Sequence, residues 1–325
     1  MPDLQPFLLA PEFHERIWGT RDLRPIYTRI VGEQPIGEAW LTGDACKVAN
    51  GPLAGESLSA LCKKFGAALT GSKSNPADHF PLLIKFLFPH EKLSVQVHPD
   101  DARAQRIGQP CGKTECWYVT SAEPGAKVLL GLKPGVSNKD FERAIHEKRA
   151  EHLLNEITVR AGDMIYVDAG TVHAICPGAI MIETQQNSDT TYRLYDYGRP
   201  RELHVEQGLA ATKEHTHAGK VRPEGNGSRT TLVASPSFIV ERIDAREPWL
   251  LKGEERGASV QVLVSVSGSA AVHSAGMEPI AFTPGEAIVI PAECDEYEVR
   301  PQWECEILRM SLPAHSVPEP ITTLL

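Results

Sequence analysis

The chain lacks the features of membrane and secreted proteins. No stretch of its 325 residues approaches the roughly 18 to 20 consecutive apolar residues that a membrane-spanning helix needs. The N-terminal segment MPDLQPFLLAPEFHERIWG has neither a basic start nor the apolar run of a secretory signal. We therefore expect a cytoplasmic protein that does not cross a membrane.

An excess of basic residues is also missing. The chain has 33 Lys and Arg against 42 Asp and Glu, a formal net charge of −9. This balance argues against nucleic acid or an anionic membrane as the main partner. A pocket can still be locally basic and bind a small anion. Nothing in the sequence indicates an obligate protein partner.

The seven cysteines form neither a disulfide framework nor a Cys-x-x-Cys pair. In a cytoplasmic chain an odd, scattered set predicts reduced thiols. Cys111 and Cys116 flank Glu115, but adjacent residues on a strand point to opposite faces, so Cys116 should point away from Glu115. We therefore do not expect a thiolate metal site.

The segment AGDMIYVDAGTVHAI contains a recognisable spacing. Gly162 is followed after five residues by Asp168, and then by Gly170 and His173. This is the spacing of the second cupin motif, with Asp168 in the position of its proline. The spacing predicts a hairpin turn at Gly162, a short buried strand over 164–167 and a bend at Gly170 that turns His173 inward.

The same spacing recurs 123 residues further along the chain. Gly285 is followed after five residues by Pro291, with Glu293 in the second glycine position and Glu296 where the histidine should stand. The separation is about the length of one jelly-roll domain. We interpret the repeat as an internal duplication whose second copy kept its turn and lost its metal ligand.

Short alternating strands in both halves predict a mainly β fold with two cupin or jelly-roll β-barrel domains and a few short helices. We place the catalytic cupin domain at residues 1–212, a linker at 213–229 and a degenerate cupin domain at 230–325. One helix is expected in the segment 55–71, with Ser57 as N-cap and Gly66 or Gly71 ending it, and another at 138–157. The segments 114–121 and 126–132 are expected to form a hairpin around Pro124-Gly125. His215 and His217 lie in the polar linker, where we expect solvated side chains rather than a metal site.

Two further polar clusters are expected to share a cavity with His173. In LSVQVHPDD, strand alternation places Ser94, Gln96 and His98 on one face, and Glu115 stands at a strand edge in GKTECWYV. Two imidazoles, a carboxylate and a carboxamide oxygen make a plausible zinc site with one open position. The ligands would be Gln96, His98, Glu115 and His173.

The polar run IETQQNSDTTYRLYDYGR follows the His173 segment and contains Glu183 and Arg193. On an exposed strand such a pair is usually a surface salt bridge. Its place next to the predicted metal site makes both residues candidates for catalysis.

These segments together resemble the type I mannose-6-phosphate isomerases in their short bacterial form. The resemblance covers most of residues 13–210, and the C-terminal domain more loosely. It runs through IWG, IGEAWLTG, NGPLAGESL, PLLIKFL, LSVQVHPDD, GKTECWYV, AGDMIYVDAGTVHAI and SDTTYRLYDYGR.

The resemblance implies one zinc ion per chain and interconversion of mannose 6-phosphate and fructose 6-phosphate through a cis-enediol. It places the zinc ligands at Gln96, His98, Glu115 and His173. Glu183 and Lys113 become the acid/base candidates, with Glu183 ranked first, and Arg193 stabilises the enediolate or contacts phosphate. Ser94 and Arg199 match positions similar to phosphate-contacting residues. The large helical insertion of the longer enzymes is missing.

Three other functions were weighed against this one. A non-enzymatic cupin that binds metal or sugar predicts decay of at least one ligand or of Arg193, and all five residues are present. An iron cupin dioxygenase favours an early His-x-His, but Gln96 stands in the first of these positions. A fused nucleotidyltransferase needs a long glycine-rich nucleotide domain that the chain lacks.

Overall fold

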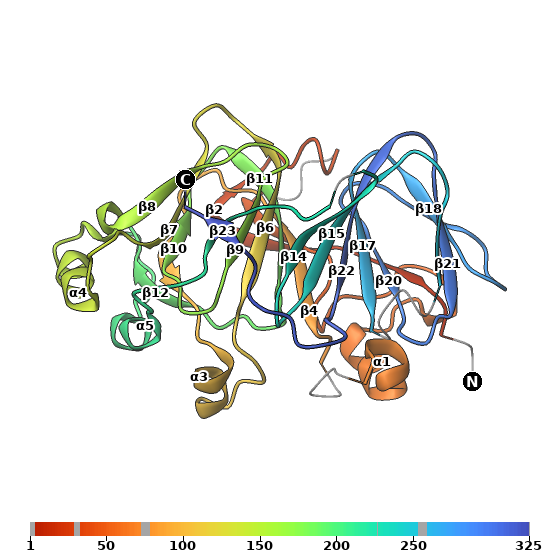
Figure 1. Cartoon of the computed structure of the whole chain (residues 1–325), viewed down its shortest axis with the longest axis horizontal. Helices are drawn as coiled ribbons and strands as arrows, with labels where there is room; N and C mark the ends of the chain where they lie inside the picture. Colours follow the sequence, from red (N-terminus) through yellow and green to blue (C-terminus); the bar gives the residue numbers. More distant parts are fainter. Residues whose placement is uncertain (1–3, 29–32, 73–78, 226, 253–258, 325) are drawn as a thin grey trace.

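The computed structural model describes residues 4–28, 33–72, 79–225, 227–252 and 259–324. Strands make up most of the regular structure, which confirms the mainly β prediction, and the described strands form four sheets (Figure 1). Asn226 of the predicted linker and residues 253–258 of the predicted C-terminal domain lie outside the described residues. No helix in these ranges is long and apolar enough to cross a membrane.

Two sheets come mainly from the first two thirds of the chain. The five-stranded sheet has the order β12 (Tyr192–Tyr195), β5 (Val95–Val97), β10 (His173–Ile175), β7 (Lys127–Leu132) and β8 (Leu154–Thr158). The eight-stranded sheet has the order β2 (Glu12–Thr20), β3 (Ile36–Trp40), β4 (Leu82–Leu87), β11 (Ala179–Gln186), β6 (Glu115–Ala122), β9 (Met164–Val167), β13 (Gly219–Val221) and β23 (Thr322–Thr323).

The other two sheets come mainly from the last third. The six-stranded sheet has the order β1 (Phe7–Leu9), β20 (Ala287–Ile290), β17 (Gln261–Ser267), β22 (Cys305–Ser311), β15 (Ile239–Ala245) and β14 (Arg229–Ala234). The four-stranded sheet has the order β16 (Trp249–Lys252), β21 (Glu296–Pro301), β18 (Ala270–His273) and β19 (Ile280–Phe282). β16 and β19 were missed by the sequence analysis.

The helices are short. The α-helices are α1 (Leu58–Phe65), α2 (Ala67–Thr70), α3 (Asp101–Arg106), α4 (Asn138–His146) and α5 (Val205–Ala211), and the 3-10 helices are Gly51–Leu53 and Ala150–Leu153. The Ser57 hydroxyl accepts a hydrogen bond from the Ala60 N–H, which confirms the predicted N-cap of α1.

Each pair of sheets encloses its own core. Trp117 of β6 and Met181 of β11 pack in one cluster with Leu130 of β7 and Ile175 of β10, so the eight- and five-stranded sheets face each other. In the same way residues of β17, β20 and β22 share a cluster with residues of β18 and β21. The arrangement is that of two β-sandwiches, seen as two lobes side by side in Figure 1.

A third core joins the two sandwiches back to back. Phe86 and Tyr118 from the outer face of the eight-stranded sheet pack in the same cluster as Val262 and Leu308 of the six-stranded sheet. Figure 1 shows β15 and β22 in the middle, between the lobes. This explains why all six residues of β4 are buried, since a strand that is covered on both faces has no solvent-exposed side.

The two ends of the chain cross between the lobes. β1 pairs with β20, and β23 pairs with β13, which in turn pairs with β9. The predicted linker therefore contains a strand, because Lys220 finds a partner in β9 that its polar sequence did not reveal. The division at residues 212 and 230 remains a proposal, and these two end strands would lie across it.

Two local predictions were wrong. The helix predicted over 138–157 ends at His146, since Lys148 adopts a positive φ of 57° and Leu154–Thr158 pairs with β7 as strand β8. The strands β6 and β7 do not form a hairpin around Pro124-Gly125. Because both edges of β6 are already taken by β9 and β11, the turn carries the chain into the opposite sheet.

The internal repeat is visible in the backbone. Gly162 and Gly285 both have positive φ, 88° and 92°, and each is followed by a four-residue strand, β9 and β20. His173 and Glu296 are each the first residue of the next strand. The turn predicted at Gly162 leads from β8 to β9, which lie in different sheets, so it is not a hairpin turn.

The second sandwich carries a different polar cluster at the matching place. Glu115 pairs across its sheet with Gln185 and Val167, and Gln261 pairs correspondingly with Ser311 and Ile290. By the same register, the positions of Lys85 and Glu183 correspond to Glu241 and Arg309, where the two charges are exchanged.

The residue that faces this second interior is Tyr297 rather than Glu296. Tyr297 is buried and its hydroxyl donates to Gln261 at 2.6 Å, whereas Glu296 is exposed. The repeat thus kept its turn, but the inward-facing position is shifted by one residue.

Candidate metal centre

Strand register builds one wall of a cavity inside the first sandwich. On the five-stranded sheet Gln96 lies directly opposite His173 of β10 and Arg193 of β12. Residues paired across neighbouring strands project from the same face of a sheet. The register thus brings these three side chains to one row, although 97 positions separate the first from the last.

The opposite wall is a matching row on the eight-stranded sheet. Glu183 of β11 pairs with Lys85 of β4 and with Trp117 of β6. Glu115 lies two residues before Trp117 and so shares its face, while Cys116 packs in the core between the sandwiches. The prediction that Cys116 points away from Glu115 is confirmed.

Between the walls, three buried side chains converge. One ligand atom each from His98, Glu115 and His173 lies within 4.8 Å of the others. The Glu115 carboxylate is 3.5 Å from Nε2 of His98 and 3.3 Å from Nε2 of His173. Each of the three side chains is at most 2% exposed.

The donor set fits a divalent cation. Nδ1 of His98 contacts the Thr190 carbonyl at 2.9 Å, and Nδ1 of His173 contacts the Thr171 carbonyl at 3.0 Å. Donation at Nδ1 leaves the lone pair of each Nε2 directed at the carboxylate, the usual arrangement around a metal. Oε1 of Glu115 is buried without a hydrogen-bond partner among the described residues. Oε1 of Glu115 and Nε2 of His173 thus face each other at 3.3 Å as two acceptors, an arrangement that a bound cation would satisfy.

The ionisation of these groups points the same way. Burial lowers the pKa of His173 to about 4, and burial together with Lys113 holds the pKa of His98 well below its usual range. Burial raises the pKa of Glu115 although Lys113 opposes the shift. Neutral imidazoles are ready to ligate, and a bound cation would supply the charge that keeps the carboxylate ionised.

Gln96 completes the set at one side. Its amide Nε2 lies 3.2 Å from Nε2 of His173, and the Ser94 hydroxyl lies 3.1 Å from its oxygen. A half-turn of the amide directs the oxygen toward the metal position and lets its NH2 donate to Ser94. The four predicted ligands are thus brought together.

The cavity beside this cluster has a volume of about 440 Å³ and is lined by both basic and acidic side chains. Its described basic lining residues are Arg16, Lys85, Lys113, Arg193 and Arg201, and its acidic ones are Glu38, Glu115, Glu183 and Asp189. A cavity of this size and polarity suits a small charged ligand.

Glu183 is held as a carboxylate at the cavity wall. The indole N–H of Trp117 donates to it at 2.9 Å, Nζ of Lys85 is 3.1 Å away, and Nζ of Lys113 is 3.7 Å away. Burial alone would raise the pKa of Glu183, but Lys113 and Lys85 outweigh it and lower the pKa. Glu183 and its neighbour Glu38 in turn raise the pKa of the buried Lys85.

Lys113 bridges this carboxylate and the metal cluster. Its ammonium donates to Glu115 and lies 3.1 Å from Nε2 of His98. The structure therefore brings together all three residues that the sequence analysis placed in catalysis, Arg193, Glu183 and Lys113, around one cavity.

Arg199 is not among the described residues that line this cavity. Its guanidinium is taken up by Asp196 and by the carbonyl of Lys92, at 2.7 and 2.8 Å. The loop beyond β12 thus holds Arg199 away from the cavity in this structure, and its contact with substrate stays a prediction. Arg201 lines the cavity instead, next to Arg193, while Ser94 lines it as expected.

Sequence reasoning also missed Lys85, Glu38 and Arg16. Glu38 accepts from Arg16 at 2.8 Å and from the Trp40 indole at 2.8 Å. Burial would raise the pKa of Glu38, but Lys85 and Arg16 lower it to about 2. One signal was available: Lys85 is the only charged residue in the buried run LLIKFL, and such a residue needs a partner.

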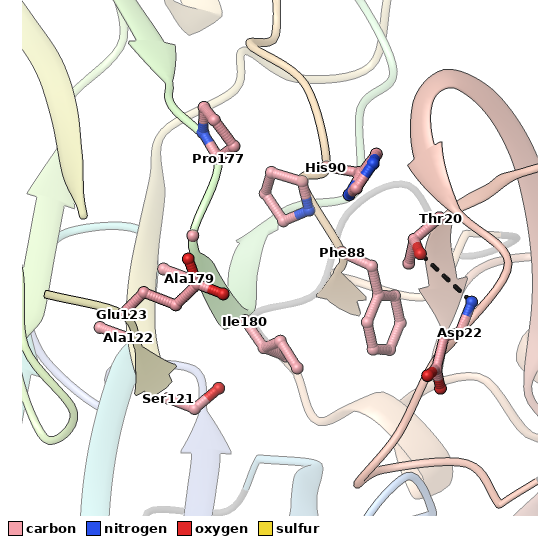
Figure 2. A pocket seen from close by; sticks show the side chains of 12 residues that line it. Thr20, Asp22, Phe88, His90, Ser121, Ala122, Glu123, Pro177, Ala179 and Ile180 are labelled. Atoms are coloured by element: carbon pink, nitrogen blue, oxygen red, sulfur yellow. Dashed lines mark hydrogen bonds between the residues drawn. The ribbon is translucent and has the colours of Figure 1, made fainter. Parts of the chain in front are cut away.

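A larger cavity, of about 500 Å³, lies elsewhere and has no comparable chemistry (Figure 2). Its polar side chains, which include Thr20, His90 and Glu123, come from separate segments and do not converge. His215 and His217 are exposed and lie outside the metal cluster.

The fold and the site define a cupin-type metalloprotein with a polar cavity beside the metal position. The family model "Phosphomannose isomerase type I, catalytic domain" matches residues 7–115. A probable mannose-6-phosphate isomerase of Bacillus subtilis is 34% identical over 322 residues, covering 93% of this chain and 98% of the relative. A mannose-6-phosphate isomerase of Streptococcus mutans is 35% identical over 302 residues, covering 88% and 92%.

Solved structures agree with the sequence matches. The crystal structure of a mannose 6-phosphate isomerase from Bacillus subtilis superposes with a TM-score of 0.84 at 30% identity, covering 94% of this chain and 99% of the other. A zinc-bound mannose 6-phosphate isomerase shares the fold with a TM-score of 0.77 at 16% identity. The chain belongs to the type I phosphomannose isomerase family.

Proposed function

We propose that this chain interconverts mannose 6-phosphate and fructose 6-phosphate, with one zinc ion held by Gln96, His98, Glu115 and His173. The observation that supports it most is the convergence of His98, Glu115 and His173 beside a charged cavity that Glu115 lines, with Oε1 of Glu115 left without a hydrogen-bond partner among the described residues. When bound, zinc would supply Lewis-acid polarisation of the sugar oxygens.

Glu183 is the proposed general base. Isomerisation of the open-chain aldose removes a proton from C2 and returns one to C1, through a cis-enediol. Trp117 and Lys85 fix the Glu183 carboxylate in one orientation and keep it ionised, which is the state that can accept a proton. The same carboxyl group, once protonated, can deliver the proton to C1.

Lys113 and Arg193 provide positive charge where negative charge develops on the sugar oxygens. Lys113 lies between Glu183 and the metal cluster, so its ammonium is within reach of an oxygen bound there. Arg193 faces the same cavity, and its Nε is buried without a hydrogen-bond partner among the described atoms. Fixed donors of this kind stabilise an enediolate more than the neutral sugar.

The phosphate is proposed to lie near Arg201 and Ser94. Both residues line the cavity, where the Arg201 guanidinium offers the planar set of N–H donors with which arginine binds phosphate and Ser94 offers a hydroxyl. Arg201 takes the role that sequence reasoning gave to Arg199.

Zinc removal tests the proposal as a whole. We expect about one equivalent of zinc per chain by elemental analysis, and fructose 6-phosphate formation that a chelator abolishes and added zinc restores. A protein that binds zinc and sugar phosphate but shows no isomerisation would be the non-enzymatic cupin instead. Two tightly bound equivalents would contradict a single site per chain.

Replacing Arg193 tests its electrophilic role. Arg193→Ala should lower kcat about 10²- to 10³-fold, as for other oxyanion donors, while KM rises much less and zinc stays bound. Arg193→Lys should restore little, because an ammonium does not reproduce the planar fork of donors. A rise in KM with kcat intact would make Arg193 a phosphate contact only.

A further inference from the structure

Asp196, directly after β12, is a buried carboxylate shared by two arginines. Its side chain is 1% exposed. It accepts from Nε and Nη2 of Arg201, both at 2.7 Å, and from Nε and Nη2 of Arg199 at 3.1 and 2.7 Å. A single carboxylate thus fixes two planar guanidinium groups at once, each by two hydrogen bonds.

The two arginines serve different places. Arg201 lines the cavity beside Arg193. Arg199 turns the other way and donates to the Lys92 carbonyl at 2.8 Å, in the segment that leads into β5 with Ser94 and the proposed ligand Gln96. The carboxylate therefore connects the loop that carries Arg201 to the strand that carries part of the metal site.

The rest of the loop is held in one conformation. Tyr197 has a φ of 56°, a strained value for a residue with a side chain. Its ring contacts the Lys92 ammonium and the Arg199 guanidinium, at 5.4 and 5.5 Å from the ring centroid. Strain of this kind persists where surrounding contacts over-determine the backbone, and it is concentrated at functional sites.

We propose that Asp196 is a positioning residue for the phosphate group of the substrate. It holds the Arg201 guanidinium toward the cavity beside Arg193, and through Arg199 it fixes the loop against the start of β5. The inference rests on the proposed function, because it assigns to Arg201 a contact with the phosphate of a sugar phosphate.

Asp196 could act by offsetting positive charge or by orienting Arg201, and these two roles predict opposite changes in phosphate affinity when its carboxylate is removed. If Asp196 only offsets positive charge, its removal should strengthen the attraction of the cavity for phosphate. If Asp196 orients Arg201, its removal frees a long side chain that must be ordered again on binding. The bidentate contact and the buried carboxylate favour orientation as the larger effect.

The test is Asp196→Asn, which keeps the shape and removes the charge. KM for mannose 6-phosphate and the inhibition constant of inorganic phosphate should both rise about tenfold or more, the value of one charge-assisted hydrogen bond. kcat at saturation should change much less, and zinc content should stay at the wild-type value. Glu304→Gln is the matched control, since it removes the same charge from an exposed pair with Arg246 and should alter none of these constants.

A folded Asp196→Asn protein whose phosphate inhibition constant is unchanged or lower overturns the proposal. If that variant does not fold, Arg201→Met tests the phosphate contact on which the role of Asp196 depends, because Asp196 keeps Arg199 as its partner in that variant. An unchanged phosphate inhibition constant in Arg201→Met also overturns the proposal. Direct binding of inorganic phosphate by calorimetry gives a reading without turnover. Failure of the wild-type protein to isomerise would thus reject the enzyme proposal and remain distinguishable from failure of the role of Asp196.

Discussion

His173→Ala and Glu115→Ala should each lose zinc and activity together. Each replacement removes one of the three buried donors that lie within 4.8 Å of one another, which should weaken zinc binding, and losing the Lewis-acid contribution of several kcal/mol corresponds to a loss on the order of 10³-fold in rate. Elemental analysis and a coupled fructose 6-phosphate assay on the same preparations measure both losses.

The linker histidines provide the control for this experiment. His215 and His217 are exposed and are not part of the metal cluster, so replacing both with alanine should change neither zinc content nor rate. A zinc-free Glu115→Ala protein with full activity would contradict the proposed metal site. Zinc retained at one equivalent in both ligand variants would place the metal elsewhere.

Glu241→Ala should destabilise the protein by about 3–5 kcal/mol, the usual cost of leaving a buried charge without its partner. Glu241 accepts from Nε of Arg309 at 2.7 Å, and the Arg309 side chain is 5% exposed. The six-stranded sheet that holds both residues packs directly behind the strand that carries Glu115. Chemical denaturation of the zinc-loaded protein measures the change.

A paired replacement separates charge from packing. Glu241→Leu combined with Arg309→Met removes both charges and should recover most of the lost stability, since apolar residues of similar volume often replace a buried ion pair without cost. Glu304→Ala, at an exposed pair, should leave stability close to the wild-type value. A Glu241→Ala protein as stable as the wild type would show that Arg309 is not buried in solution.

The sequence alone went furthest where the local pattern and the burial of a strand agree. Alternation in LSVQVHPDD put Gln96 and His98 on one face. The turn predicted at Gly162 led to a predicted strand over 164–167, and the observed strand Met164–Val167 begins and ends at these residues. The mainly β fold followed from the same alternation. The sequence was less successful at 138–157. There α4 and β8 have similar apolar spacing, and only the pairing of β8 with β7 decides between helix and strand.

The choice of partners across the sheets was decided by the tertiary structure. Glu183, Lys85 and Trp117 form one row only because β4, β11 and β6 are neighbours in this register. A sequence does not state which strands adjoin, so it did not identify Lys85 as the partner of Glu183.

The sequence by itself determined the donor atoms: two imidazoles, a carboxylate and a carboxamide. It did so because residue type and strand alternation are local properties. Only the tertiary structure decided that Arg201 and not Arg199 lines the cavity, and that Tyr297 and not Glu296 faces the second interior. Both outcomes depend on how a loop or strand end meets groups distant in the chain: Asp196 and Lys92 direct Arg199 away from the cavity, and Gln261 accepts the hydroxyl of Tyr297.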